Sequence, residues 1–275
     1  MYPFIHLGPI TIGTFGLMLW FSAVFACWVL YLNFKRWKID ADAISIIAFA
    51  TVAGVAGAKL YHVLEKPEVL MAHPSLLISR AGFAWFGGLI AGVAALLWQG
   101  GTYKIRPLRM LDLCSPSAAL GYGIGRWGCQ LSGDGDYGIP TKMWFGMSYP
   151  HGIVPTTQKV YPTPIFEFIA ATIIFYILWR RSRPGAPRRL GQITGEYLIW
   201  TGAARFLVEF IRRNPKIFLD LTNAQWASVG SILVGIVLIW WARKYGSLVE
   251  IGQDGLKPEG DDGSKAEPVA AAGHG

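Results

Sequence analysis

The chain has 275 residues, of which 53% are hydrophobic, 14% aromatic and only 15% charged. Soluble domains carry about a quarter charged residues, so this composition disfavours a soluble enzyme, a disordered chain and a coiled coil, and favours a bilayer-embedded protein. The formal net charge is +8. It does not indicate a nucleic-acid partner, because the basic residues form short clusters between apolar runs, which is typical of membrane topology.

Seven apolar stretches are long enough for membrane helices, which need about 20 mostly apolar residues. Three contain no charge, and four contain one to three ionisable residues. We therefore predict an all-α integral membrane protein with seven transmembrane helices. In chain order, the predicted spans are residues 10–34, 41–64, 81–101, 110–125, 164–179, 192–211 and 224–242.

The loops orient these spans. Clusters of Lys and Arg follow the first, third, fifth and seventh spans. Because basic residues accumulate on the cytoplasmic side, we expect a periplasmic N-terminus and a cytoplasmic C-terminus. Residues 126–163 are predicted to form an irregular periplasmic excursion between spans four and five. We expect residues 1–244 to form one seven-span domain and residues 245–275 to form a disordered cytoplasmic tail.

The sixth predicted span carries ionisable residues at a depth where each is costly unless it is paired. Arg205, Glu209 and Arg212 are spaced by four and three residues, so they share one helical face. A structural ion pair between Arg205 and Glu209 is one interpretation. The other is a lipid-phosphate site, because a guanidinium binds phosphate through two parallel hydrogen bonds.

A second polar segment, residues 121–138, reads GYGIGRWGCQLSGDGDYG and contains Arg126 where the fourth predicted span ends. Its glycines permit close backbone approach and positive φ angles. A tightly packed helix end explains them as well as a binding loop does. A nucleotide-binding loop is disfavoured, because the segment lacks the Gly-Lys-Ser/Thr sequence.

A third segment, YPTPIFE at 161–167, opens the fifth predicted span. Proline is common near a helix start, but Glu167, one turn inside the membrane, needs a cation or a donor. Lys59, Tyr61 and His62 are candidate partners, although Lys59 can also extend to the interface. The histidines and cysteines lack metal-ligand spacing, so we predict no metal. Together the arginines, carboxylates and glycine-rich loop indicate an anionic lipid headgroup as ligand.

These segments, in this order, resemble the prolipoprotein diacylglyceryl transferase family. The resemblance implies an enzyme of the bacterial inner membrane with its active site towards the periplasm. It implies transfer of the diacylglyceryl group of phosphatidylglycerol to the lipobox cysteine of prolipoproteins, the first step of lipoprotein maturation, without a cofactor. The matching motifs are IHLGPI at 5–10, GAKLY at 57–61, GGLI at 87–90, GRWG at 125–128 with Asp134 and Gly138, YPTPIFE at 161–167, RFLVEFIR at 205–212 and TNAQWAS at 222–228.

By position, the resemblance implies that Arg126 and Arg205 hold the lipid phosphate and stabilise the departing phosphate. Asp134 occupies an acidic position of the signature and is the third catalytic candidate. Glu209 is expected to orient Arg205 or Arg212 through an ion pair. With Arg126, the substrate-binding candidates are Glu209, Arg212, Gly138, Gly87, Gly88, Cys129, His62 and Glu167.

Four positions depart from the family pattern. Phe86 stands where a histidine often serves as thiol base, and Phe15 where tyrosine is common. Cys129 replaces a frequent asparagine, and Asp136 is an added loop residue.

Phenylalanine cannot accept a proton, which leaves three alternatives. Another group is the base, with His62, Asp134 and Asp136 as candidates, or the arginine field lowers the thiol pKa enough. The third alternative is a paralogue that binds or translocates phosphatidylglycerol without turnover. An ion channel is disfavoured, because the spans show no repeated line of polar residues.

Overall fold

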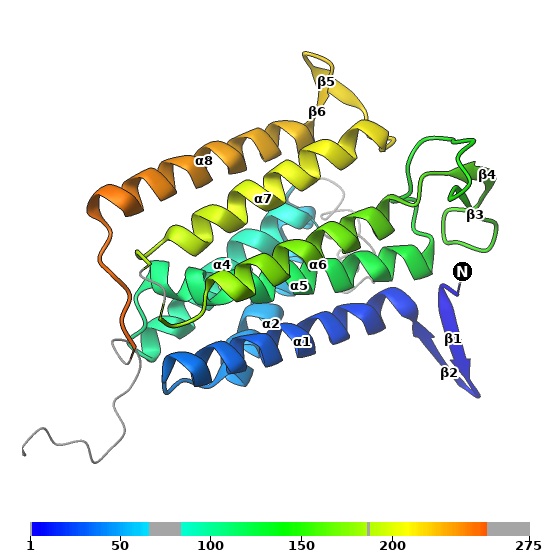
Figure 1. Cartoon of the computed structure of the whole chain (residues 1–275). Coiled ribbons are helices and arrows are strands. Elements are labelled where there is room, and N and C mark those ends of the chain that lie inside the picture. Colours follow the sequence, from blue (N-terminus) through cyan, green and yellow to red (C-terminus); the bar gives the residue numbers. More distant parts are fainter. Residues whose placement is uncertain (1, 66–83, 186–187, 252–275) are drawn as a thin grey trace, which may run out of the picture.

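The computed structural model describes residues 2–65, 84–185 and 188–251. In this part of the chain there are seven α-helices, which run alongside one another in a bundle (Figure 1). Each predicted span falls on one of them. The helices are α1 (Thr14–Trp37), α2 (Ala43–Leu64), α4 (Trp85–Thr102), α5 (Pro107–Ser132), α6 (Thr163–Arg181), α7 (Gln192–Val208) and α8 (Asn223–Tyr245).

Four of these helices are long and apolar enough to cross a membrane: α1, α2, α6 and α8. Their outer faces carry exposed large apolar side chains such as Trp20, Ile173 and Leu233. In water such faces would be costly, whereas acyl chains solvate them. The structure is therefore that of a mostly helical membrane protein. Among the other helices, α7 is the shortest, with 17 residues.

Local sequence determines where several helices begin. The Thr222 side chain accepts a hydrogen bond from the Gln225 backbone, and the Gln225 side chain accepts one from the Thr222 backbone, which forms a capping box for α8. Asp42 caps α2 through the Ile44 amide, 2.9 Å away. Pro107 occupies the first turn of α5, where its missing N–H costs nothing.

Two predicted boundaries are wrong. Residues 10–13 do not belong to the first helix; β2 (Ile10–Gly13) pairs with β1 (Phe4–Leu7) in an antiparallel hairpin. This hairpin is attached to the bundle, because the Tyr2 amide donates to the Leu131 carbonyl over 3.1 Å.

The second wrong boundary is the end of the fourth span at 125. Helix α5 continues to Ser132 and ends only at Gly133, whose φ of +59° is left-handed. Arg126 therefore lies inside α5 and not at its end. The glycines before it are helical, and two of them serve packing: Gly121 faces Ser22 of α1, and Gly123 faces Ala171 of α6.

The excursion between α5 and α6 is partly regular. Strand β3 (Met147–Tyr149) pairs with β4 (Thr156–Val160), and the rings of Tyr137 and Tyr149 stack at 4.8 Å inside the excursion. A third small hairpin, β5 (Lys216–Phe218) with β6 (Leu221–Thr222), precedes α8. None of these hairpins was predicted from the sequence.

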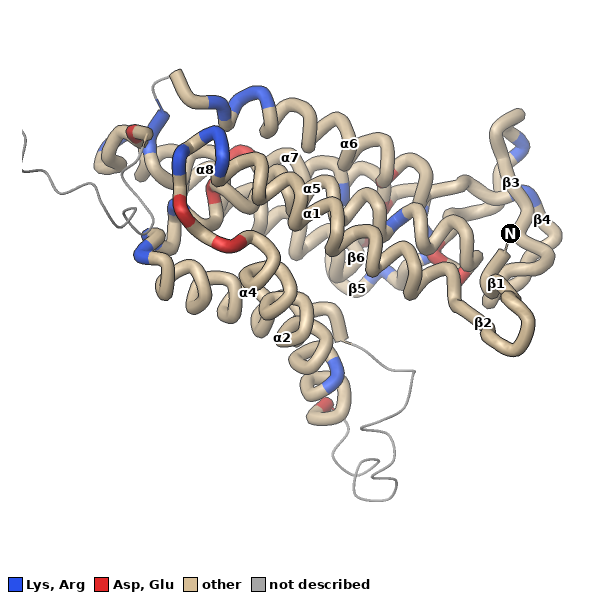
Figure 2. Tube along the Cα trace, turned by 90° about the horizontal axis from the view of Figure 1, so that it is seen from below, with Lys and Arg blue, Asp and Glu red and all other residues tan. Residues whose placement is uncertain are grey.

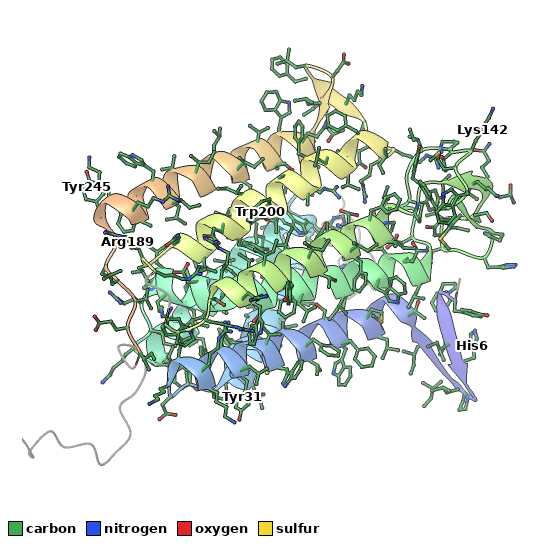
Figure 3. All side chains as sticks on the ribbon, in the orientation of Figure 1. His6, Tyr31, Lys142, Arg189, Trp200 and Tyr245 are labelled. Carbon is green, nitrogen blue, oxygen red and sulfur yellow. The ribbon has the colours of Figure 1, made fainter. Side chains whose placement is uncertain are left out.

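The two ends of the bundle differ (Figures 2 and 3). Figure 3 places His6 and Lys142 at one end, and Arg189 and Tyr245 at the other. Many Lys and Arg residues gather at the latter end, far from β3 and β4. The first residues of the predicted tail are ordered, because the Leu190 amide donates to Ser247 and the Val249 amide to Arg188. The rest of that tail, 252–275, lies outside the described residues.

Candidate functional site

Charged side chains from five segments meet at the end of the bundle that carries the excursion. Helices α5, α6 and α7 each contribute, together with the loop after α5 and the short 3-10 helix η2 (Glu209–Ile211) that follows α7. We call this group the arginine cluster. Its members are Arg126, Arg205, Arg212, Asp136, Glu167 and Glu209.

Glu167 lies at the centre of the arginine cluster, and its side chain is 3% exposed. Its Oε1 accepts hydrogen bonds from Arg205 at 2.6 Å and from the Tyr122 hydroxyl at 2.7 Å. Its Oε2 accepts one from Arg212 at 3.1 Å and lies 3.7 Å from Nε of Arg126. One carboxylate thus holds three guanidinium groups in fixed relative positions, which offsets the cost of burying it.

These contacts correct one prediction. Lys59, Tyr61 and His62 were candidate partners of Glu167, but its cations come from α5, α7 and the residue after η2. Sequence reasoning missed Tyr122, although a signal was present. Tyr122 and Arg126 are four residues apart on α5, so they share a face, and the guanidinium lies 5.0 Å from the ring centroid.

Glu209 is the second buried carboxylate. Its Oε2 lies 2.9 Å from Nη2 of Arg205 and 3.7 Å from Nε of Arg212, so the predicted ion pair with each arginine is present. Its Oε1 accepts hydrogen bonds from Asn214 and from the Thr222 hydroxyl, the latter at 2.9 Å. Through Thr222, the N-cap of α8, this carboxylate ties the two arginines to the start of the last helix.

Asp136 is the third carboxylate, and it bridges two arginines. Its Oδ2 pairs with Arg126, and its Oδ1 accepts a hydrogen bond from Arg212 at 2.6 Å. Burial raises its pKa, but the charges of Arg212 and Arg126 outweigh burial, and the pKa of Asp136 lies below its ordinary value. The loop reaches this position through Gly133 and Gly135, whose φ angles are +59° and +97°.

Gly138 contributes packing close to the cluster. A Cβ at this position would lie 2.3 Å from the Ile211 carbonyl, so only glycine lets the loop approach the end of α7 this closely. The Gly138 amide donates to Tyr161 at 2.8 Å, and the Ile139 amide donates to Ile211 at 2.9 Å. This close approach brings Asp136 to Arg212.

Exposure divides the arginine cluster into a floor and a rim. The side chains of Glu209, Glu167 and Arg212 are 0%, 3% and 7% exposed and form the floor. Those of Arg126, Arg205 and Asp136 are 19%, 24% and 32% exposed and form the rim. The guanidinium groups of Arg126 and Arg205 are held by buried carboxylates and stay partly exposed, so they are suited to bind an anionic group such as a phosphate.

Asp134 and Cys129 adjoin this rim. Ligand atoms of Cys129, Asp134 and Asp136 all lie within 4.8 Å of one another. Nη1 of Arg126 pairs with Asp136 and lies 3.9 Å from the Cys129 sulfur, so a cation already occupies this position and we assign no metal. Burial, followed by the charge of Asp136, raises the pKa of Asp134 above its ordinary value.

The remaining candidates lie on or near the α2–α4 pair, which leans away from the other helices (Figure 2). Gly87 packs against Gly57 of α2, whose carbonyl would lie 2.4 Å from an added Cβ, and Gly88 packs against Ala58. Within the described residues, no hydrogen bond or ion pair joins His62 to the arginine cluster. Phe86 is exposed.

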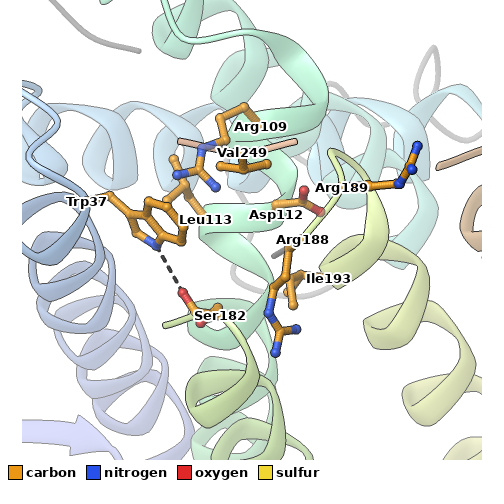
Figure 4. A pocket seen from close by; sticks show the side chains of 9 residues that line it. All are labelled: Trp37, Arg109, Asp112, Leu113, Ser182, Arg188, Arg189, Ile193 and Val249. Atoms are coloured by element: carbon orange, nitrogen blue, oxygen red, sulfur yellow. Dashed lines mark hydrogen bonds between the residues drawn. The ribbon is translucent and has the colours of Figure 1, made fainter. Parts of the chain in front are cut away.

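A second polar region lies at the opposite end of the bundle, around Asp112 of α5. Its carboxylate accepts hydrogen bonds from the Gly191 amide at 2.7 Å, the Thr194 amide at 2.8 Å and the Thr194 hydroxyl at 2.6 Å. We call this the Asp112 region. Figure 4 shows the small pocket beside it, lined by Trp37, Arg109, Asp112, Leu113, Ser182, Arg188, Arg189, Ile193 and Val249.

Comparison with known proteins agrees with the motifs that form the arginine cluster. Residues 3–241 match the model of a family described as prolipoprotein diacylglyceryl transferase. The chain belongs to this family. Similar relatives named phosphatidylglycerol–prolipoprotein diacylglyceryl transferase come from Cupriavidus metallidurans and Lactococcus lactis.

Both relatives are similar to this chain over most of its length. The Cupriavidus protein is 30% identical over 258 residues, 88% of this chain and 93% of the relative. The Lactococcus protein is 30% identical over 245 residues, 87% of this chain and 93% of the relative. The likeness therefore covers nearly all the helices and is not confined to one motif.

Proposed function

We propose that the chain transfers the diacylglyceryl group of phosphatidylglycerol to the lipobox cysteine of prolipoproteins at the arginine cluster. Family membership and the names of the relatives support this activity. One observation carries the choice of site. Arg126 and Arg205, which stand at family motifs far apart in the sequence, bind the same buried Glu167 and remain open at the rim.

The reaction balances as a substitution at carbon. The thiolate sulfur of the lipobox cysteine forms a bond to the glyceryl carbon that carries the phosphate ester. The carbon–oxygen bond breaks, and glycerol phosphate leaves with the electron pair. Negative charge moves from sulfur to the departing phosphate, so groups that bind the phosphate more strongly as its charge grows lower the barrier.

Arg126 and Arg205 are placed to supply this stabilisation. Their rim position lets them contact a phosphodiester while the floor carboxylates hold them in position. Glu167 and Glu209 act as positioning residues, because they are buried and reach substrate only through the arginines that they bind. Pre-set donors of this kind cost little reorganisation during the reaction.

Asp134 is our candidate for the group that takes the thiol proton. It lies beside the rim, and its raised pKa makes it a stronger base than an ordinary carboxylate. The neighbouring guanidinium groups also favour the thiolate. A base is then available although Phe86 occupies the family's histidine position.

For topology, we infer seven membrane spans in the bacterial inner membrane, with the N-terminus periplasmic and the C-terminus cytoplasmic. The clustered Lys and Arg far from β3 and β4 support a cytoplasmic location for that end. The arginine cluster, next to the excursion, then faces the periplasmic side, where prolipoproteins present their lipobox. Phosphatidylglycerol, prolipoprotein and the surrounding membrane lipids are its partners.

The deciding experiment mixes the purified full chain with phosphatidylglycerol and a lipobox peptide, and measures diacylglyceryl-peptide by mass spectrometry. We expect product from the wild-type chain and none above background from Arg126→Ala or Arg205→Ala. An active relative assayed in parallel confirms the assay. Lack of product from the wild-type chain, with phosphatidylglycerol still bound, would favour the lipid-binding paralogue that Phe86 and Phe15 suggest.

A further inference from the structure

The arginine cluster is electrically balanced, which creates a problem for an anionic ligand. Three guanidinium groups face three carboxylates, and each arginine contacts at least two of them. A phosphodiester entering this group adds a negative charge beside carboxylates that already hold the donors. Binding is therefore favourable only if one carboxylate gives up its place.

Burial identifies which carboxylate can leave. Glu167 and Glu209 are the carboxylates of the floor, and moving either into solvent would leave two or three guanidinium groups without this partner. Asp136 is the most exposed member of the cluster, and its two oxygens contact one arginine each. Its main chain is fixed separately, because the Thr163 hydroxyl donates to its carbonyl at 2.5 Å. Rotation of its side chain alone is enough to release both arginines.

The geometry of Asp136 also matches that of the ligand. One carboxylate oxygen faces Arg126 and the other faces Arg212, with 2.6 Å to the latter. Two non-bridging oxygens of a phosphodiester can make the same pair of charge-assisted hydrogen bonds. The carboxylate therefore occupies a position that a phosphate can fill.

We propose that Asp136 is an internal competitor that sets the affinity of the site for phosphate. Its carboxylate bridges Arg126 and Arg212 until the lipid phosphate displaces it, and it returns when glycerol phosphate departs. The product carries more negative charge than the substrate, so without the competitor it would stay bound longer. This inference rests on the proposed function, because it takes the phosphate to be that of the lipid substrate and its product.

Binding of glycerol phosphate tests the competitor without requiring turnover. Titration calorimetry on the full chain in detergent compares wild type with Asp136→Asn, which removes the charge and keeps the shape. We expect Asp136→Asn to bind about 3- to 10-fold more tightly, because the fraction of open sites rises. Asp220→Asn is the matched control: it removes one exposed aspartate on the turn between β5 and β6, and its affinity should equal that of wild type.

Steady-state kinetics provide a second test, because a purely structural role of Asp136 would not produce the changes expected here. In Asp136→Asn, the KM for phosphatidylglycerol should fall, and inhibition by added glycerol phosphate should strengthen by a similar factor. Asp136→Glu keeps a competing charge, so it should resemble wild type more than Asp136→Asn does. A folded Asp136→Asn protein that binds glycerol phosphate no more tightly than wild type overturns the proposal.

The two proposals fail in different ways. If the wild-type chain binds glycerol phosphate but makes no lipidated peptide, the transferase assignment fails, and the competitor is judged by the binding series alone. If the chain makes product but Asp136→Asn gains no affinity, the transferase stands and the competitor is rejected. If neither wild type nor Asp136→Asn binds glycerol phosphate, the competitor is also rejected.

Discussion

The arginine cluster and the Asp112 region use buried charge in opposite ways. In the cluster, charged side chains bind other charged side chains, and each carboxylate serves two or three arginines. In the Asp112 region, the carboxylate accepts hydrogen bonds from two backbone amides and one hydroxyl at the start of α7. The nearby Arg181 binds one partner, Glu196, at 2.6 and 2.7 Å.

This difference indicates which of the two regions binds a ligand and which stabilises the fold. Asp112 satisfies amides that α7 would otherwise bury without a partner, so its role is to fix a helix end. The cluster satisfies few backbone groups and keeps two guanidinium groups partly open, an arrangement better suited to an external anion than to stability. Mutations should therefore separate the regions, with activity lost in one and stability in the other.

The largest effect is expected from Arg205→Ala. Loss of one donor to the developing phosphate charge should reduce the transfer rate by about 10²- to 10³-fold. Arg181→Ala is the matched control at the other end, where the side chain is 48% exposed and pairs with a single carboxylate; its rate should stay within about twofold. Rates are measured with the peptide assay, and membrane insertion by recovery from the detergent extract.

Arg205→Lys sharpens this test. Lysine keeps the charge but loses the planar group that contacts Glu167 and Glu209 together, so activity should fall between wild type and Arg205→Ala. Wild-type activity in Arg205→Lys would show that charge alone is sufficient.

For the Asp112 region we predict a loss of stability. Asp112→Ala leaves the Gly191 amide, the Thr194 amide and the Thr194 hydroxyl without this acceptor, so the free energy of unfolding should fall by roughly 2–5 kcal/mol. The comparison is Asp42→Ala, an exposed N-cap whose loss costs about 1 kcal/mol. Unfolding is followed in detergent, and activity per folded molecule should remain unchanged in both variants.

A smaller effect concerns pH. The pKa of Asp136 is lowered in the folded protein, so its contribution to stability is present above its unfolded pKa of about 4 and is lost as pH falls through the lowered value. The pKa of Asp134 is raised, so its contribution is present at low pH and is lost as pH rises through the raised value.

Relative to wild type, the thermal midpoints of two variants should therefore move in opposite directions as pH falls towards and below the unfolded aspartate pKa of about 4. Asp136→Asn should be less stable than wild type at neutral pH, with the difference shrinking in acid. Asp134→Asn should be at least as stable as wild type at neutral pH. Parallel shifts of both variants across the whole range would contradict the assignment of opposite pKa changes.

The smallest effect is expected from His62→Ala. No hydrogen bond or ion pair among the described residues links His62 to the cluster, so the pH–rate profile should be unchanged. Loss of an ionisation from that profile in His62→Ala would restore His62 as a candidate base.

Sequence patterns predicted the helices well, because every apolar run of span length became a helix. They also predicted that Arg205, Glu209 and Arg212 lie together, and both arginines do contact Glu209, although α7 ends before Glu209 and Arg212 follows η2 in an extended conformation. The predicted partners of Glu167 were wrong, because its partners depend on which helices pack together. The pairing of α5, α6 and α7 around Glu167 is set by tertiary packing, which periodicity does not encode.

Other misses have local causes. The glycines before Arg126 resembled a helix end, yet they lie inside α5. Their lack of a side chain lets α5 approach α1 at Gly121 and α6 at Gly123. The real stop is Gly133, where the backbone becomes left-handed. The hairpin at 4–13 was missed because its apolar residues continue directly into the first helix and strengthen the helical pattern.

The attachment of the N-terminal hairpin has a consequence for biogenesis. The hairpin is synthesised well before its anchor, the Leu131 carbonyl at the end of α5. At about 5–20 residues per second, that interval is roughly 7–26 s. On the proposed topology, the hairpin waits on the periplasmic side of the membrane while α2, α4 and α5 are inserted, and its docking marks completion of the first half of the molecule.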